Sequence, residues 1–240
     1  MGLSKVEILE DLRADILRLQ GHKTHTDQFF NAGLGPILKS FPQNAFPIGA
    51  IHEFITSKQQ SQASTTGFVL GILSGLMGKN GALVWISDTR VVFPPAFNHY
   101  GVSPDQIVFV NLRKEKEVMW AMEEALKCSG LSAVVAEVKN LSFTSSRRLQ
   151  LAVEESLVTG FVLNSSNRVN PTACVTRWQV SSVQSDSTGL PGVGFPRWQV
   201  TLLKVRNGKP GTWTLQWIGG RFEFHSHEVS ESKFSQMKVG

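Results

Sequence analysis

Alternation between short apolar runs and helix-like segments is the feature that most constrains how this chain can fold. From residue 49 onward, runs such as ALVWIS and AVVAEV are each followed by a segment with apolar residues at helical spacing. Short, almost wholly apolar strands are typical of a parallel sheet whose two faces are both covered by helices. The alternation therefore predicts an α/β core with a mainly parallel sheet and helices on both faces.

The elements of this core follow one another along residues 49–165. Strands are expected at 51–55, 82–87, 107–110, 133–138 and 160–163, and helices at 63–79, 93–100, 114–127 and 144–157. After residue 172 the pattern changes to successive strands at 175–183, 198–205 and 212–218, separated by turn-rich segments such as RNGKPG. An antiparallel β extension is therefore predicted at the C-terminal side of the core. The tetrapeptide RWQV occurs at 177–180 and 197–200 and is expected at equivalent positions on neighbouring strands.

The chain ends are predicted to differ from the core. Apolar residues at helical spacing from Val6 to Leu19 predict an N-terminal helix, and the Gly- and Pro-rich stretch Gly21–Pro47 is expected to be a tether. We expect residues 1–44 to form this helix and tether, and residues 225–240 to form a polar tail. The main domain then covers residues 45–224, with the α/β core at 45–165 and the β extension at 172–224.

Composition excludes several classes of protein. An apolar content of 41% over 240 residues is enough for one domain with a core. Neither a membrane-spanning run nor a secretory signal is found, so a cytoplasmic location is expected. The net charge of +5 resides in residues 147–240, which carry 11 basic and 6 acidic side chains. This excess is compatible with an acidic or phosphate-bearing partner, and equally with an ordinary soluble surface.

The segment after the first core strand lacks the residues of a phosphate-binding loop. Such a loop, GxxxxGK[ST], needs glycines for its backbone N–H groups, a lysine for the phosphates and a hydroxyl for magnesium. Here TSKQQSQASTT contains no glycine, and aligning Thr65 or Thr66 with the hydroxyl position puts Ser64 where the lysine belongs. Lys58 is the nearby cation, on the other side of the loop. We therefore predict a degenerate nucleotide site and neither a cofactor nor a metal.

Glu137 ends the apolar strand AVVAE, where a nucleotide-binding fold would carry a magnesium-binding aspartate. A glutamate could ligate a metal, but without the loop it has no phosphate to bridge. We favour a strand-end acid that is solvated or paired with Lys139.

Two further patterns need an explanation. Arg147 and Arg148 begin a helix after a polar loop, and they could hold a nucleic-acid backbone or an acidic protein surface, or form a solvated pair with Glu154 or Glu155. Ala63, Gly67, Gly71 and Gly75 fall four apart on one helix face. Because glycine weakens a helix by about 1 kcal/mol relative to alanine, this face is expected to lie close to other backbone and to be buried.

The order of several segments resembles the bacterial ImuA family, RecA-like proteins of the SOS mutagenesis cassette. These segments are FPIGAIHEF, STTGF, ALVWISD, FPPAFNHYGVSPDQIVFV, AMEEALKC, AVVAEV, SSRRLQLAVEES and TGFVL, with the RWQV strands and GKPGTWTLQW as the C-terminal extension. The resemblance implies a RecA-like three-layer core. The chain departs from the RecA ATPase at Ser64, Thr89 and Glu137, so nucleotide hydrolysis is not expected.

The same resemblance implies a non-catalytic accessory factor in DNA-damage-induced translesion synthesis. Its implied partners are an ImuB-like polymerase homologue and an error-prone DNA polymerase, with RecA and single-stranded DNA as further candidates. The arginines that would contact DNA or a partner are Arg147, Arg148, Arg168, Arg177 and Arg197. Two alternatives stay open: a SulA-like cell-division inhibitor that binds FtsZ, and an NTPase with a divergent loop.

Overall fold

A computed structural model describes residues 30–56, 59–78, 81–88, 93–166, 170–185 and 194–224. The predicted helix Val6–Leu19 and the predicted tail 225–240 lie outside these residues.

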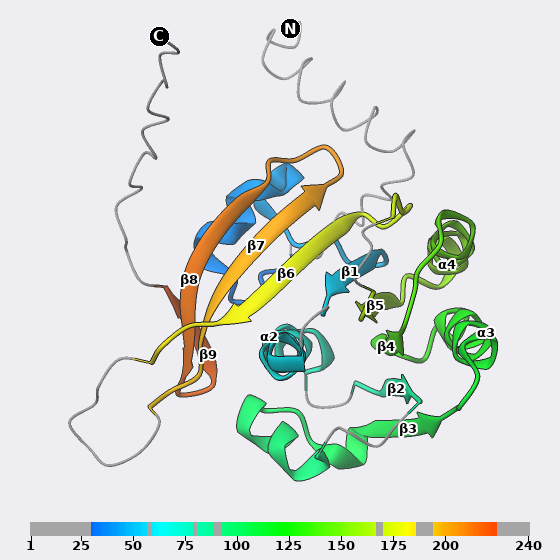
Figure 1. The fold of residues 1–240 in the computed structure, drawn as a ribbon, viewed down its shortest axis with the longest axis horizontal. Coiled ribbons are helices and arrows are strands. Elements are labelled where there is room, and N and C mark those ends of the chain that lie inside the picture. Colours follow the sequence, from blue (N-terminus) through cyan, green and yellow to red (C-terminus); the bar gives the residue numbers. More distant parts are fainter. Residues whose placement is uncertain are drawn as a thin grey trace, which may run out of the picture.

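A single nine-stranded sheet organises the described chain, in the order β3-β2-β4-β5-β1-β6-β7-β8-β9. Neighbouring strands from β3 to β6 are parallel, and those from β6 to β9 are antiparallel, as Figure 1 shows. The predicted mainly parallel sheet with an antiparallel extension is thus confirmed. The strands are β1 (Ile51–Ile55), β2 (Leu83–Ser87), β3 (Ile107–Asn111), β4 (Ala133–Val138), β5 (Thr159–Asn164), β6 (Thr176–Ser182), β7 (Arg197–Val205), β8 (Gly211–Ile218) and β9 (Arg221–Phe224).

Helices cover the two faces of the parallel part of the sheet. One face carries α2 (Gln59–Met77), and the other carries α3 (Glu115–Leu126) and α4 (Phe143–Ser156), which lie side by side in Figure 1. Short 3-10 helices complete the described elements: η1 (Gly35–Ser40), η2 (Pro42–Asn44), η3 (Pro94–Tyr100) and η4 (Pro104–Gln106). The three-layer arrangement is consistent with a RecA-like core.

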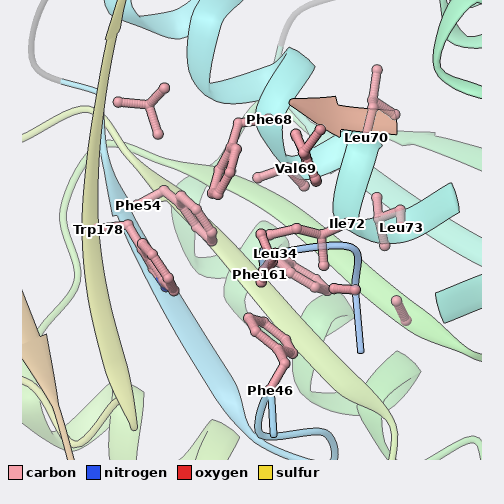
Figure 2. Close-up of a cluster of buried hydrophobic side chains, with 14 of the residues drawn as sticks. Leu34, Phe46, Phe54, Phe68, Val69, Leu70, Ile72, Leu73, Phe161 and Trp178 are labelled. Atoms are coloured by element: carbon pink, nitrogen blue, oxygen red, sulfur yellow. The ribbon is translucent and has the colours of Figure 1, made fainter. Parts of the chain in front are cut away.

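Alternate residues of the central strands fill two separate apolar layers. In β4, for example, Val135 packs in the layer that contains α2, whereas Val134 packs in the layer beneath α3 and α4. All five residues of β1 are buried, because this strand has neighbours on both sides and helices on both faces. Figure 2 shows the α2 layer, where the Phe54 and Trp178 rings stack with centroids 6.0 Å apart.

The described part of the predicted tether belongs to this core. Leu34, Ile37, Phe41 and Phe46 are all buried in the α2 layer, and Phe46 is seen there in Figure 2. The Gly and Pro content indicated a loop, but the apolar residues between the turns bury it against the sheet.

Strand β9 was not predicted, because RFEF is short and follows β8 through a tight Gly219-Gly220 turn.

A series of buried hydrogen bonds holds the segment before β1 against β6. Trp178 Nε1 donates to Thr176 Oγ1 at 2.7 Å, and this hydroxyl then donates to His52 Nδ1, also at 2.7 Å. The remaining His52 nitrogen, Nε2–H, donates to the Pro47 carbonyl at 2.8 Å. Burial lowers the pKa of His52 to about 4, so the ring is neutral at physiological pH.

The repeated RWQV segments do lie on neighbouring strands. They run antiparallel, and Val180 of β6 stands opposite Val200 of β7, so a local two-fold relates the two copies. The two tryptophans are buried, whereas Arg177 and Arg197 lie at opposite ends of the strand pair.

The expected burial of the glycine face of α2 is seen at Gly67 and Gly71, which meet side chains and not other backbone, whereas Ala63 and Gly75 are exposed. A Cβ on Gly67 would lie 2.6 Å from the Tyr100 hydroxyl, and one on Gly71 would lie 2.9 Å from the Trp217 ring and still closer to Phe222. The helix therefore packs its backbone directly against aromatic side chains of η3, β8 and β9.

Changing Gly71 to alanine is expected to lower the free energy of unfolding by about 1–3 kcal/mol, measured by urea denaturation, because the methyl group overfills a packed site. This loss would be seen despite the gain of about 1 kcal/mol in helix propensity. Gly130→Ala is the matched control, since a Cβ there has nothing within 4 Å. A Gly71→Ala variant as stable as the parent would contradict the packing of this face.

Candidate functional site

The candidate site is a crevice at the carboxyl ends of the parallel strands, the place where open α/β sheets bind ligands. Its cavity has a volume of 210 Å³. The residues that line it come from the ends of β1, β2, β4 and β5, from the start of α2, from the segment between β3 and α3, and from the first turn of α3. They are Thr56, Gln62, Asp88, Arg113, Glu115, Val118, Glu137, Val138, Lys139, Leu163 and Ser165.

Helix α2 occupies the segment where a phosphate loop would lie. Strand β1 ends at Ile55 and α2 begins at Gln59, so only residues 56–58 join them. Backbone N–H groups beyond the first turn of a helix bond to carbonyls of the same helix, and those of residues 63–66 fall in this category. Ser64 and Thr65 are buried, and Thr66 is half-buried.

The hydroxyl of Thr65 is buried without a hydrogen-bond partner among the described residues. It is not among the residues that line the cavity, so it does not stand where it could meet a ligand there. Lys58 and Thr89 lie outside the described residues.

Glu137 is held by neutral donors on the floor of the cavity. Trp85 Nε1 donates to one carboxylate oxygen at 3.0 Å, and Gln62 Nε2 donates to the other at 3.4 Å. Burial raises the pKa of Glu137; the bond from Trp85 lowers it, and the charge of Asp88 raises it further. The expected pairing with Lys139 is not seen, because Lys139 Nζ lies 3.0 Å from Asp88 instead.

Charge and size give the crevice a character unlike a triphosphate site. Among the described residues, three carboxylates, Asp88, Glu115 and Glu137, line it together with two cations, Arg113 and Lys139. Pockets for drug-sized ligands have volumes of roughly 300–1,000 Å³, larger than this cavity. Among the described residues no group of three or more His, Cys, Asp or Glu side chains is placed to hold a metal ion.

The predicted arginines are distributed over several elements. Arg148 of α4 pairs with Glu123 of α3 at 2.6 Å, and its neighbour Arg147 is exposed, without an ion pair to any described residue. Arg177 is mostly but not fully buried, and Arg197 is half-buried at the other end of the β6–β7 pair. Arg168 lies outside the described residues. The structure brings Arg147 and Arg148 together but keeps Arg177 and Arg197 apart.

Arg177 belongs to a buried ion pair that the sequence analysis did not identify. It stands beside Glu53 in the parallel β1–β6 register, and its Nε donates to Glu53 Oε2 at 2.8 Å. The two side chains are 11% and 1% exposed. The Thr172 hydroxyl donates to the same oxygen at 2.8 Å, and Asn164 Nδ2 donates to Oε1 at 2.9 Å. The available signal was a glutamate, next to a histidine, inside the short strand run IHEFI.

The chain segment that crosses this pair is fastened by further bonds. Arg177 donates to the Asn170 carbonyl at 2.5 Å, and Lys204 Nζ donates to the Thr172 carbonyl at 2.8 Å. Burial, with the nearby charge of Glu53, raises the pKa of the Cys174 thiol to about 12, so this thiol is protonated and unreactive. We conclude that the cluster is structural: it joins the parallel part of the sheet to the extension.

The α/β core, the strand order and the β extension are those of an α/β protein consistent with a RecA-like core. Comparison with known sequences agrees with this class. The chain is 33% identical to Protein ImuA of Caulobacter vibrioides strain NA1000 / CB15N, over a 193-residue alignment that covers 73% of this chain and 78% of the relative. The same protein of strain ATCC 19089 / CIP 103742 / CB 15 matches to the same extent. The chain therefore belongs to the ImuA family, as its segments predicted.

No family model matches the chain. The helices of the described part include none with the length and apolar character that crossing a bilayer would require.

Glu53→Gln is expected to lower the free energy of unfolding by about 3–5 kcal/mol in urea denaturation, because Arg177 would stay buried without its counter-charge. The double variant Glu53→Leu/Arg177→Met is expected to recover much of this loss, since it removes both charges. If the single variant were as stable as the parent, the pair would not hold β6 to β1 in the way described.

Proposed function

We propose that the chain is a non-catalytic, RecA-like accessory factor in DNA-damage-induced translesion synthesis, and that it acts through protein partners. Membership of the ImuA family supports a role in translesion synthesis. One structural observation supports the absence of catalysis: α2 begins at Gln59, inside the segment that would otherwise bind a phosphate. In a helix that begins at Gln59 the backbone N–H groups of residues 63–66 are engaged, so those four are not available to phosphate oxygens.

The crevice supports the same proposal. A nucleoside triphosphate needs more positive than negative charge around it, whereas the described residues of the cavity lining hold three carboxylates and two cations. Of those two, Lys139 is already neutralised by Asp88. We infer that the phosphate loop and the magnesium site are both degenerate, and that Glu137 now serves to anchor Trp85 and Gln62.

Protein partners are favoured over direct DNA contact by where the arginines lie. Arg177 and Arg148 are engaged by Glu53 and Glu123, and Arg197 is far along the sheet from Arg177. We propose an ImuB-like polymerase homologue and an error-prone DNA polymerase as partners, with RecA and single-stranded DNA as secondary candidates. That the five arginines contact DNA remains a prediction.

The SulA-like alternative would lack the GAIHEF strand and the C-terminal extension. In this chain that strand, β1, stands at the centre of the sheet between β5 and β6, and the extension continues from it. These elements favour the accessory role.

Deleting the gene for this chain from its host is expected to abolish the rise in mutation frequency after ultraviolet damage, scored as rifampicin-resistant colonies. A plasmid copy of the gene is expected to restore that rise. Undamaged cells are the control, because spontaneous mutation should not change. Filamentation of cells that overproduce the chain, with no effect on induced mutation, would instead favour the division inhibitor.

Titrating the chain with ATP and magnesium in a calorimeter is expected to give no binding heat, because α2 begins within the loop segment and the described lining of the crevice is not cationic. Thr65→Val and Lys58→Ala are the informative variants. Micromolar binding that either variant removes would establish a divergent NTPase and overturn the non-catalytic assignment.

A further inference from the structure

The two outer strands of the sheet differ in how their open edges are protected. Among the described strands, β3 has β2 as its only neighbour and β9 has only β8, so they end the sheet on its two sides (Figure 1). Proteins blunt such edges with charged residues, prolines or bulges, because an open edge pairs with other strands. Strand β9, RFEF, carries Arg221 and Glu223. Strand β3, IVFVN, carries neither a charge nor a proline, and its register with β2 is continuous.

The backbone of β3 offers hydrogen-bonding groups on its open side. Backbone groups of a parallel strand point alternately to its two sides, and those of Leu112, just after β3, point to β2, since its N–H donates to the Ser87 carbonyl at 2.9 Å. By this alternation the groups of Ile107, Phe109 and Asn111 point away from β2. The Ile107 N–H donates to the first carbonyl of η4. The Ile107 carbonyl and both groups of the other two residues have no partner among the described residues.

Apolar side chains are exposed on both faces of this edge. Val108 is 58% exposed and lies on the α3 side of the sheet, like the half-buried Val110 two positions later. Phe109 lies on the α2 side, where its ring meets the buried Phe97 of η3 with centroids 5.9 Å apart, yet the residue is 38% exposed. A strand of β-branched and aromatic residues with these exposures is suited to pairing with a further strand.

We propose that β3 pairs antiparallel with β3 of a second copy of this chain, so that the two sheets become one. The register that overlaps the whole of both strands places Phe109 opposite Phe109 of the second copy, with a two-fold axis between them. The pairing goes beyond the proposed function and does not depend on it.

Backbone and side chains agree in this register. The two Phe109 backbones face each other with both of their outward groups, and each Ile107 carbonyl accepts the Asn111 N–H of the other copy. A two-fold axis perpendicular to the sheet keeps every side chain on its own face. Val108 of one copy therefore stands opposite Val110 of the other on the α3 face, and the two Phe109 rings meet on the α2 face. Each exposed apolar residue of β3 thus gains an apolar partner.

Charges at the two ends of the strand match the same register. Asp105 precedes β3 and Arg113 follows it, at equal distances along the chain from Phe109, and both are exposed. Neither forms an ion pair with a described residue: Asp105 accepts the Ser103 hydroxyl, and Arg113 lines the strand-end crevice. Antiparallel pairing brings Asp105 of each copy to the level of Arg113 of the other. Parallel pairing would instead place like charges together.

This self-match selects a second copy over an extended segment of another protein. The copy brings apolar residues, outward backbone groups and opposite charges to matching positions from its own sequence, and its strand is already formed. A flexible segment would lose conformational entropy on being ordered along the edge, which weakens its binding.

The pairing has a geometric consequence for larger assemblies. Because the two-fold axis is perpendicular to the sheet, helices α3 and α4 of both copies lie on one face of the joined sheet, and α2 of both copies lies on the other. The strand-end crevices point in opposite directions, since the paired strands are antiparallel. A partner that recognises the α3–α4 face would therefore meet two copies side by side.

Sedimentation velocity of the full chain tests the pairing. A five-residue edge buries a small area, so we expect a monomer–dimer equilibrium with a dissociation constant on the order of 10 µM. Val108→Lys should raise this constant about tenfold or more, because a lysine on an edge strand opposes pairing. The position is largely exposed, and the thermal midpoint would verify that the variant is folded.

Reversing the end charges is a second test, which leaves the strand itself unaltered. Asp105→Arg and Arg113→Asp should each weaken the dimer severalfold, because each places like charges opposite each other. The double variant Asp105→Arg/Arg113→Asp should restore the parent dissociation constant, since opposite charges again meet across the axis. A double variant that dimerises no better than the single ones would overturn the register.

Cysteine cross-linking measures the register directly. Val108→Cys and Val110→Cys would each be made with Cys128→Ser, because Cys128 is exposed. Opposed residues that exchange no hydrogen bonds have Cα atoms about 4.5 Å apart, a distance that a disulfide spans. Mixing the two variants under mild oxidation should therefore give linked dimers. Either variant alone should give few, since identical positions lie diagonally, roughly 7–8 Å apart.

Trp120→Ala and Phe195→Ser are the controls, because they remove exposed rings on α3 and just before β7 and should leave the dissociation constant unchanged. Three results would overturn the proposal. The chain could stay monomeric at roughly ten times the expected constant; a dimer could dissociate in Trp120→Ala but not in Val108→Lys; or each cysteine variant alone could cross-link as well as the mixture.

Discussion

The position of β1 is the constraint on which the rest of the structure depends. This strand joins the parallel half of the sheet to the antiparallel extension, and all of its side chains are buried. The two polar residues within it find their ion-pair and hydrogen-bond partners in different ways. Glu53 binds Arg177 across to β6, and His52 links Thr176 to the Pro47 carbonyl. Because both bonds reach the first strand of the extension, the two halves of the sheet form one unit.

Much of the fold could be predicted from the sequence because its signals are local. Short apolar strands, helical spacing in the segments between them and turn-rich breaks placed the core elements near their observed bounds, and the glycine spacing of α2 predicted the burial that is seen at Gly67 and Gly71. Three features could not be predicted in this way. The burial of residues 32–46 depends on a distant sheet face, β9 is too short to show a period, and the start of α2 at Gln59 depends on how the loop after β1 folds.

The site was harder to predict, because side-chain partners are set by tertiary structure. The missing glycines and lysine indicated an altered phosphate loop. They gave no indication that Lys139 would form its ion pair with Asp88 and not with Glu137. Arg177 was recognised as a cation, yet its partner lies 124 positions earlier in the chain. Trp120 lies within an ordinary amphipathic helix, and only the packing of α3 beside α4 shows that its ring stays outside the core.

The continuous start of α2 has a consequence for regulation. Nucleotide-driven proteins change shape because a terminal phosphate holds loops that relax after hydrolysis. Under the proposed non-catalytic role, this chain has no equivalent trigger there, so it would present the same outline throughout its life. Control over when it acts would then reside in how much of it the cell makes and in which binding partners are present.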